Sequence, residues 1–571
     1  MDRVTARIAR CAPPIRLPWI FRRRVPSPLR LLLGCCVALA CSLGPALAQE
    51  PAPEQKIPSF AELEAAGAII GEVRIDNQDI FDPNDPAENG VLYRAANFIH
   101  IRTRAEVIRR QLLFKSGERV SVRLIEETER LLRANRILHE VGIRPLAYRD
   151  GVVDIEVKTS DTWTLAPGVG IGRSGGSNRR HATLEESNAL GTGVFVGVDR
   201  TSDAVRTTTE YRVTQPRAFD GWTAIDYVYS KNTDGDRRSV SLTRPFYALD
   251  TRWAAGFTGS KDDRIDSVFT DGATVGQFRH RQDRAEAFGG VSAGLVEGWV
   301  HRYSVGVTWQ DDRYGFEPGA PAPAQLPRDR TIAAPFVRYE VAEDSIEKVK
   351  NRDSIERPEY FAMGLQSGLQ LGRASTGFGS TEDLWLYSAN VSDGFRLAAG
   401  RTLLTSAAIA GQYGSGGIAN QLSSGSIRYY RPADGRTLLF ASLAGDLRKA
   451  PDTAEQLLLG GDTGLRGYPR NYQSGDRRLL FTVEERVYTD WYPFRLFRIG
   501  AAVFYDLGRA WGGPNENTAN AGWLGDVGFG LRILSARSAF GNIAHIDFAF
   551  PLNRDPNIRS FQFLVSTKVT L

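Results

Sequence analysis

The chain has 571 residues and a formal net charge of +5, with 42% hydrophobic and 24% charged residues. Eight arginines between Arg3 and Arg30 supply this charge, so removal of the first 48 residues would lower it from +5 to about −2, which argues against nucleic-acid binding. All four cysteines lie in the same segment, so the rest of the chain cannot be a disulfide scaffold or use cysteine as a nucleophile or metal ligand.

Residues 1–48 have the pattern of a signal peptide. The arginine-rich start precedes an apolar run from Leu29 to Leu47, which ends in the small-x-small site Ala46-Leu47-Ala48. The stretch from Leu32 to Cys35 also resembles a lipoprotein cleavage box, but its position inside the apolar run favours ordinary cleavage. We therefore expect an exported protein.

Residues 49–67 are predicted to be a linker and residues 68–160 a small α+β domain. A strand covers Glu72 to Asp76, a helix begins at a Thr103–Glu106 capping box, and Ser121 caps a second helix. Strands 139–147 and 152–159 follow, joined by a turn whose Asp-Gly pair is a strong hairpin signal. The predicted order is β-α-α-β-β, which can bury a core of its own.

From residue 161 to residue 571 the pattern indicates strands and turns only. In the last strand Phe561, Phe563 and Val565 share one face, while Gln562 and Ser566 share the other. No run of about 18 apolar residues predicts a membrane-spanning helix, but spanning strands need only about ten alternating residues. About eighteen or nineteen such segments can be drawn, and they can lie in a bilayer only if the sheet closes on itself.

The alternative for this region is a large soluble β-sandwich or propeller. The chain that ends on a strand, the alternation of short and long connections, and aromatic residues at turns, such as Trp491 and Tyr492, favour a barrel with an aromatic girdle.

An arginine in a glycine-rich loop stands close to two strand carboxylates. Arg466 follows Gly460-Gly461-Asp462, and the alternation of the next strands turns Glu484 and Asp506 to the same inner face. We therefore expect Arg466 to bridge both carboxylates with its planar guanidinium. The simpler alternative is that both carboxylates line a wet pore.

These motifs, taken together, resemble the outer-membrane insertase and translocase superfamily of the BamA and TamA type, known as bacterial surface antigen barrels. Leu465-Arg466-Gly467-Tyr468 is similar to the family's loop motif, and the stretch from Phe504 to Gly508, with Asp506 inside it, is similar to its FxDxG strand motif. The closing-strand motif is matched by four residues, Gly528, Gly530, Arg532 and Asp547.

The resemblance implies an all-β transmembrane barrel of about 16 antiparallel strands, preceded at residues 68–160 by a single POTRA-like domain in the periplasm of a Gram-negative bacterium. It implies a protein that assists insertion or translocation of unfolded outer-membrane or secreted polypeptide clients at the lipid bilayer. Strands near Trp163–Arg173 and Phe561–Leu571 would form the seam. We expect no cofactor, no metal and no nucleic acid as partners. Whether accessory proteins take part is left open.

Two other functions compete with this interpretation. A passive pore or a surface receptor could use the same scaffold without handling clients. Catalysis is not expected, because the two GxSxG matches, at residues 172–176 and 290–294, lack the helix that a serine hydrolase places after its nucleophile, and the histidines lack the spacing of metal ligands.

Overall fold

The computed structural model describes residues 57–270, 272–452, 455–513, 516, 522–539, 542–553 and 558–568. The predicted signal peptide and the first part of the predicted linker lie outside these residues. The described residues from Ile57 onward belong to one compact unit. None of its helices is both long and apolar enough to cross a membrane.

The N-terminal part is an α+β domain with a three-stranded sheet in the order β1-β3-β2, in which β1 is parallel to β3 and β2 antiparallel to it. Its elements are α1 (Phe60–Ala65), β1 (Ile69–Gln78), α2 (Val91–Ile99), α3 (Ala105–Arg109), α4 (Val122–Ala134), β2 (Leu138–Arg149) and β3 (Val152–Asp161). The turn between β2 and β3 has positive φ at Asp150 and Gly151, as an Asp-Gly hairpin turn requires.

Three features of this domain differ from the expectation. The second half of the predicted linker is packed, because Leu63 of α1 is fully buried in the core of the domain. Thr103 does not cap α3, whose N-cap is Arg104; the Thr103 hydroxyl instead accepts a hydrogen bond from Asn188. Helix α2 was not predicted.

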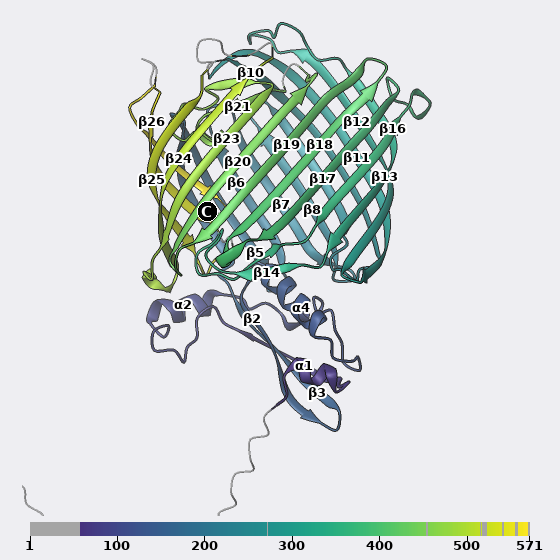
Figure 1. Ribbon diagram of the computed structural model, residues 1–571, viewed down its shortest axis with the longest axis vertical. Coiled ribbons are helices and arrows are strands. Elements are labelled where there is room, and N and C mark those ends of the chain that lie inside the picture. The colour runs from purple at the N-terminus through teal and green to yellow at the C-terminus, as the bar shows by residue number, and fades with distance from the viewer. Residues whose placement is uncertain are drawn as a thin grey trace, which may run out of the picture. The chain divides into compact units, whose positions relative to one another are not determined.

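The remainder of the chain is a closed antiparallel barrel of 20 strands (Figure 1). The strands of its first half are β4 (Leu165–Ser174), β5 (Ser177–Ala189), β6 (Val194–Ser202), β7 (Thr207–Ala218), β8 (Thr223–Asn232), β9 (Gly235–Arg244), β10 (Trp253–Thr270), β11 (Ala273–Val296), β12 (Trp299–Phe316) and β13 (Arg330–Glu343). Those of its second half are β16 (Gln366–Ala374), β17 (Leu384–Arg396), β18 (Thr402–Gly414), β19 (Gly417–Pro432), β20 (Thr437–Lys449), β23 (Arg477–Tyr488), β24 (Phe497–Trp511), β25 (Leu524–Ser535), β26 (Ile543–Pro551) and β27 (Gln562–Lys568).

The expected number of about 16 strands is therefore wrong. The first segments of the barrel, from β4 onward, all pair side by side within the closed sheet, so none of them is left outside it. The number of strands in a barrel depends on where the sheet closes, which is a long-range property that alternation within one segment does not carry.

The outer surface of the barrel is apolar, as a membrane-spanning barrel requires. Val305 of β12, Val337 of β13 and Leu371 of β16 are register neighbours, and all three side chains are exposed on the outside. The adjacent inward residue Ser304 is buried. The sheet closes on itself, with its weakest pairing between β27 and β4, so it fits the hydrocarbon of an outer membrane.

Two long connections enter the barrel from opposite ends. We call the end at which β4 begins the near end, and the opposite end the far end. The far-end loop, residues 450–476, joins β20 to β23 and contains β21 (Leu457–Leu459) and β22 (Gln473–Gly475). The near-end hairpin, residues 344–365, joins β13 to β16 and contains β14 (Ile346–Val349) and β15 (Glu359–Ala362).

Candidate functional site

The far-end loop is folded tightly against the inner wall. Gly460 and Gly464 have φ values of 125° and 133°, which residues other than glycine rarely adopt. A Cβ at Gly464 would also lie 2.4 Å from Leu480 Cδ2. Leu465 and Tyr468 are fully buried in an apolar cluster formed with residues of β24 and β25. The glycines thus permit a turn that brings Arg466, between these two anchors, against the wall.

Arg466 contacts both carboxylates predicted for it. Its Nε and Nη2 donate to Asp506 at 2.7 and 2.9 Å, and its Nη1 donates to Glu484 Oε1 at 2.8 Å. The guanidinium carbon also lies 3.4 Å from the centre of the Phe504 ring. The two-pronged contact with Asp506 has a planar geometry that lysine cannot reproduce.

Lumen-facing glycines of β25 make room for this arrangement. A Cβ at Gly528 would lie 2.3 Å from Phe504 Cζ, and a Cβ at Gly530 would lie 1.9 Å from Asp547 Oδ1. Asp547 accepts a hydrogen bond from Arg532 at 2.5 Å, and its other oxygen lies 3.8 Å from Arg466 Nη1. The closing-strand motif therefore supplies both the space and the next ion pair beside the arginine.

Gly508 belongs to the same wall. A Cβ there would lie 3.1 Å from Leu479 O and 3.2 Å from Leu459 Cδ2, an atom of the far-end loop. The absence of a side chain at this position lets the loop approach strand β24 closely.

Asp526 is a third carboxylate of the site that the sequence interpretation missed. It is the register partner of Asp506, is fully buried, and accepts a hydrogen bond from the Gly467 backbone N at 3.0 Å. A Cβ at Gly467 would lie 2.6 Å from Asp526 Cβ, so this glycine is required by the close approach. Its position two residues before Gly528, on the same inward face, was the available signal.

The Tyr468 hydroxyl connects the loop to two further segments. It donates to the backbone oxygen of Gly525 at 2.9 Å and contacts the backbone of Asn553 at 3.2 Å. All four residues of the loop motif are thus held, two by apolar burial and two by direct contacts with wall carboxylates.

Arg486 extends the charge network toward the near end. Its Nε donates to Glu484 Oε2 at 2.9 Å, its side chain lies 4.1 Å from the centre of the Phe440 ring, and it is fully buried. Its Nη1 donates to the backbone oxygen of Arg352 at 3.0 Å and lies 3.7 Å from Asp353. Arg352 and Asp353 belong to the near-end hairpin, so the network touches segments from both ends of the barrel.

The near-end hairpin is a well-packed insertion. Ile355 and Met363 are buried in an apolar cluster with inward residues of the wall, among them Tyr430 and Tyr488. The Tyr430 hydroxyl donates to both oxygens of Asp353, at 3.1 and 3.2 Å. Sequence reasoning gave no signal for this element, because a short charged segment with two four-residue strands is typical of a surface loop.

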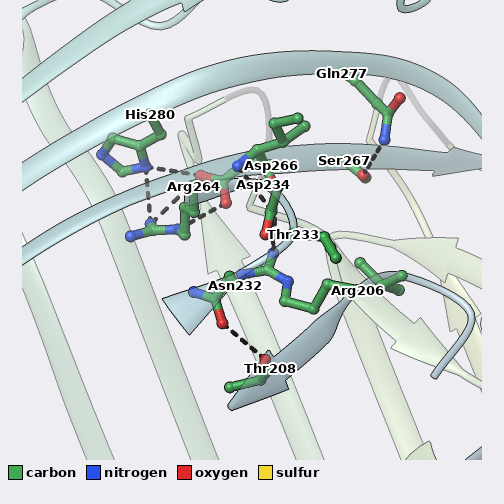
Figure 2. A network of polar contacts seen from close by, with 12 residues as sticks. Arg206, Thr208, Asn232, Thr233, Asp234, Arg264, Asp266, Ser267, Gln277 and His280 are labelled. Carbon is green, nitrogen blue, oxygen red and sulfur yellow. Dashed lines mark hydrogen bonds and ion pairs between the residues drawn. The ribbon is translucent and has the colours of Figure 1, made fainter. Parts of the chain in front are cut away.

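A separate polar network joins strands β10 and β11 to nearby far-end connections (Figure 2). His280 of β11 contacts Asp266 of β10 at 2.7 Å, and Arg264 bonds to Asp266 at 2.8 Å. Arg206 lies 3.3 Å from Asp234, which joins the β6–β7 connection to the β8–β9 connection. These contacts tie neighbouring strands together at the far end and involve no residue of the loop motif.

The residues considered for catalysis and metal binding lie apart from one another. Ser174 is at the end of β4, and Ser292, inside β11, donates its hydroxyl to the backbone oxygen of His301. Within the described ranges, no group of three or more His, Cys, Asp or Glu side chains is arranged to hold a metal ion.

Comparison with known proteins gives structural matches only. No protein-family model matches the sequence, and no curated protein matches it. BamA from Haemophilus ducreyi lacking POTRA domains 1–3 is 14% identical, with 87% of this chain and 84% of that chain covered and a TM-score of 0.37. The chain resembles BamA and CdiB. CdiB from Escherichia coli is 15% identical (87% and 76% covered, TM-score 0.46), and CdiB from Acinetobacter baumannii is 11% identical (88% and 73% covered, TM-score 0.43).

Proposed function

We propose that this protein is an outer-membrane barrel of the insertase and translocase superfamily that assists the insertion or translocation of client polypeptides. The observation that carries the proposal is the contact of Arg466 with Asp506 and Glu484, which holds a loop inside the lumen. We infer that breaking these ion pairs would release the loop, and a protein that passes polypeptides needs such a resting closure.

The α+β domain would meet unfolded clients in the periplasm as a POTRA-like domain. Both β1 and β2 lie at the edges of its sheet, in the order β1-β3-β2, and the first residues of β1 are covered by residues 117–119, to which Ile69 and Ile70 pair. An edge strand offers backbone donors and acceptors to an extended peptide, so clients would bind by strand addition.

The seam of the barrel supports entry of client strands into the bilayer. Among the described residues, β27 and β4 share one register pair, Val565 with Arg173, whereas β26 and β27 pair continuously from Ile543–Lys568 to Ala549–Gln562. Few backbone hydrogen bonds must therefore break to separate β27 from β4. The two strands are those expected to form the seam.

The test compares Arg466→Ala with Arg470→Ala after reconstitution in liposomes. Arg470 is the matched control, because it is another arginine of the far-end loop whose ion pair with Asp462 is longer, at 3.5 Å, and partly exposed. An unfolded small outer-membrane barrel protein serves as the client, and its folding and the protease accessibility of the loop are measured. We expect Arg466→Ala to change both and Arg470→Ala to change neither.

If Arg466→Ala changes neither client folding nor the protease accessibility of the loop, the role proposed for Arg466 is wrong. Planar-bilayer recordings address the alternative of a passive pore. A large, steady conductance of the unmodified protein without client folding would favour that alternative over an insertase or translocase.

A further inference from the structure

Helix α2 of the N-terminal domain presents its apolar face to the outside. Val91, Leu92, Phe98 and Ile99 are 73%, 80%, 90% and 62% exposed, and α2 has no buried residue. At 3.6 residues per turn these four positions form a single stripe along the helix. Helices of soluble domains bury such a stripe, so this one is oriented in the opposite way.

The orientation is fixed by contacts on the other side of the helix. The Asn97 side chain donates to the backbone oxygen of Phe81 at 2.8 Å and accepts from its backbone N at 3.2 Å. The Tyr93 ring packs on the Phe81 ring with centroids 4.7 Å apart. Because the polar Asn97 faces the protein, rotation of α2 to bury its apolar stripe would break these contacts.

Helix α2 itself carries one charged side chain, that of Arg94. Residues 90–104 add Arg102 and Arg104 but no aspartate or glutamate, although Arg102 pairs with Asp79 and the preceding segment, residues 79–88, carries four acidic residues. An apolar stripe on a helix whose own charge is basic is typical of helices that lie in the interface of a bilayer with anionic headgroups.

Both ends of this segment are tied to near-end turns of the barrel. Glu88, before the helix, pairs with Arg537 in the β25–β26 connection. After the helix, the Arg104 backbone N donates to Gly191 O in the β5–β6 connection at 2.9 Å. The helix is therefore bound on either side to the edge of a barrel whose outer surface faces lipid.

Exposed aromatic residues also lie on a neighbouring near-end connection. The β25–β26 connection is hydrogen-bonded to the neighbouring β23–β24 connection, from Ala536 N to Leu496 O at 2.8 Å. That connection carries Trp491 and Phe494, which are 65% and 70% exposed. Aromatic side chains at strand ends mark the level of the membrane interface in barrels.

We propose that α2 is a membrane-docking helix whose apolar stripe lies in the lipid interface beside the near end of the barrel. The occupant of the stripe is the bilayer itself, since the basic charge of the helix, at Arg94, and the exposed aromatic residues on a neighbouring near-end connection both favour a lipid surface. Helices of this kind insert their apolar face about 5–10 Å into the boundary between headgroups and acyl chains. The docking would hold the N-terminal domain at the membrane next to the turns that flank β27 and β4.

The test measures lipid contact in the full protein. Cys11, Cys35, Cys36 and Cys41 precede residue 49, so the protein without residues 1–48 has no cysteine of its own. Leu92→Cys and Phe98→Cys are each labelled with an environment-sensitive fluorophore in vesicles of phosphatidylethanolamine and phosphatidylglycerol. Quenching is measured with nitroxides on the lipid acyl chains and, separately, with iodide in solution.

The control label is Val152→Cys, an exposed position at the start of β3 in the same domain. We expect lipid nitroxides to quench both α2 labels and not the control label, while iodide quenches only the control. A second arm places the label at Ile99→Cys in a Leu92→Glu, Phe98→Glu background, where lipid quenching should be lost. These side chains are exposed, so the charges leave the core of the domain intact.

Three results would overturn the proposal. Quenching of the α2 labels by iodide alone would mean that the stripe faces water. Quenching by neither agent would mean that protein covers it, either a second copy of the chain or a bound polypeptide. Lipid quenching that survives the two glutamate substitutions would mean that the apolar stripe does not cause the contact. None of these results depends on client insertion, so the proposed function is tested separately.

Discussion

Glu484 joins Arg466 to Arg486. Its Oε1 accepts from Arg466 of the far-end loop at 2.8 Å, and its Oε2 accepts from Arg486 at 2.9 Å, which in turn donates to the backbone of the near-end hairpin. A single wall carboxylate therefore connects the two segments that enter the lumen from opposite ends. Displacement of either segment changes the charge balance around the other.

The first prediction is that Glu484→Gln loosens both segments. Loss of the carboxylate leaves two buried guanidiniums without their shared partner, and breaking a buried ion pair costs about 3–5 kcal/mol. We expect trypsin to cleave the variant in the far-end loop and in the near-end hairpin, and channel recordings to detect more frequent opening. Glu485→Gln, at the next position of β23 and not among the buried residues, is the control. Cleavage confined to the far-end loop would refute the coupling.

A second prediction separates two neighbouring aspartates. Asp506 receives two hydrogen bonds from Arg466, whereas Asp526 receives one from the Gly467 backbone. An asparagine can still accept a hydrogen bond from a backbone N–H, but it has neither the charge nor the two acceptor oxygens of the carboxylate that pairs with the guanidinium. We therefore expect Asp506→Asn to release the loop and Asp526→Asn to leave it docked, as measured by protease accessibility. Equal effects of the two substitutions would be inconsistent with this division of roles.

The third prediction concerns the lumen-facing glycines. A Cβ at Gly528 would lie 2.3 Å from Phe548 O as well as from Phe504 Cζ, so alanine forces the backbone of two strands apart. Overpacking of this kind costs about 1–3 kcal/mol. We expect Gly528→Ala to lower the temperature at which the protein shifts, on a gel, from the faster-migrating folded form to the slower-migrating unfolded form. Gly289→Ala in β11 is the matched control, because a Cβ there meets nothing within 4 Å and should leave that temperature unchanged.

Local alternation predicted which way the two carboxylates near Arg466 point. Side chains of a strand alternate between two faces, so Asp506, three residues after the exposed Val503, points inward. The same alternation along the preceding strand makes Glu484 point inward. The loop glycines then limit where Arg466 can lie. The sequence could not predict the number of strands, because barrel closure depends on the pairing of all strands at once.

The elements that sequence reasoning missed lack a local signature. The near-end hairpin is held by Tyr430 and Arg486, which are far from Asp353 in the chain. The stripe of α2 is visible as a pattern, but the side on which the helix packs is decided by its contact with Phe81. The sequence pattern predicts which residues share a face of a strand or helix. It does not predict which part of the protein, or which solvent, that face contacts.

The last prediction is a pH dependence of the near-end hairpin. Glu359 lies in β15, outside the spanning strands, and accepts hydrogen bonds from the backbone N atoms of Arg352 and Asp353 at 2.9 and 3.0 Å. Burial raises the pKa of Glu359 to about 7, and the charge of Asp353 adds to this effect. Since the pKa is raised in the folded state, the stability that Glu359 contributes is fully present below about pH 4.5 and is lost as the pH rises through about 7.

Trypsin sites within the hairpin make this change measurable. Cleavage after Lys348, inside β14, requires that this strand leave its place, so the rate of cleavage at Lys348 reports the fraction of open hairpin. With a normalised protease activity, we expect cleavage to increase between pH 5 and pH 8 in the unmodified protein. Glu359→Gln, which stays neutral, should keep the low rate over the whole range. Glu356→Gln, on the exposed side of the same hairpin, should retain the increase. A cleavage rate that does not change with pH in the unmodified protein would contradict the role proposed for Glu359.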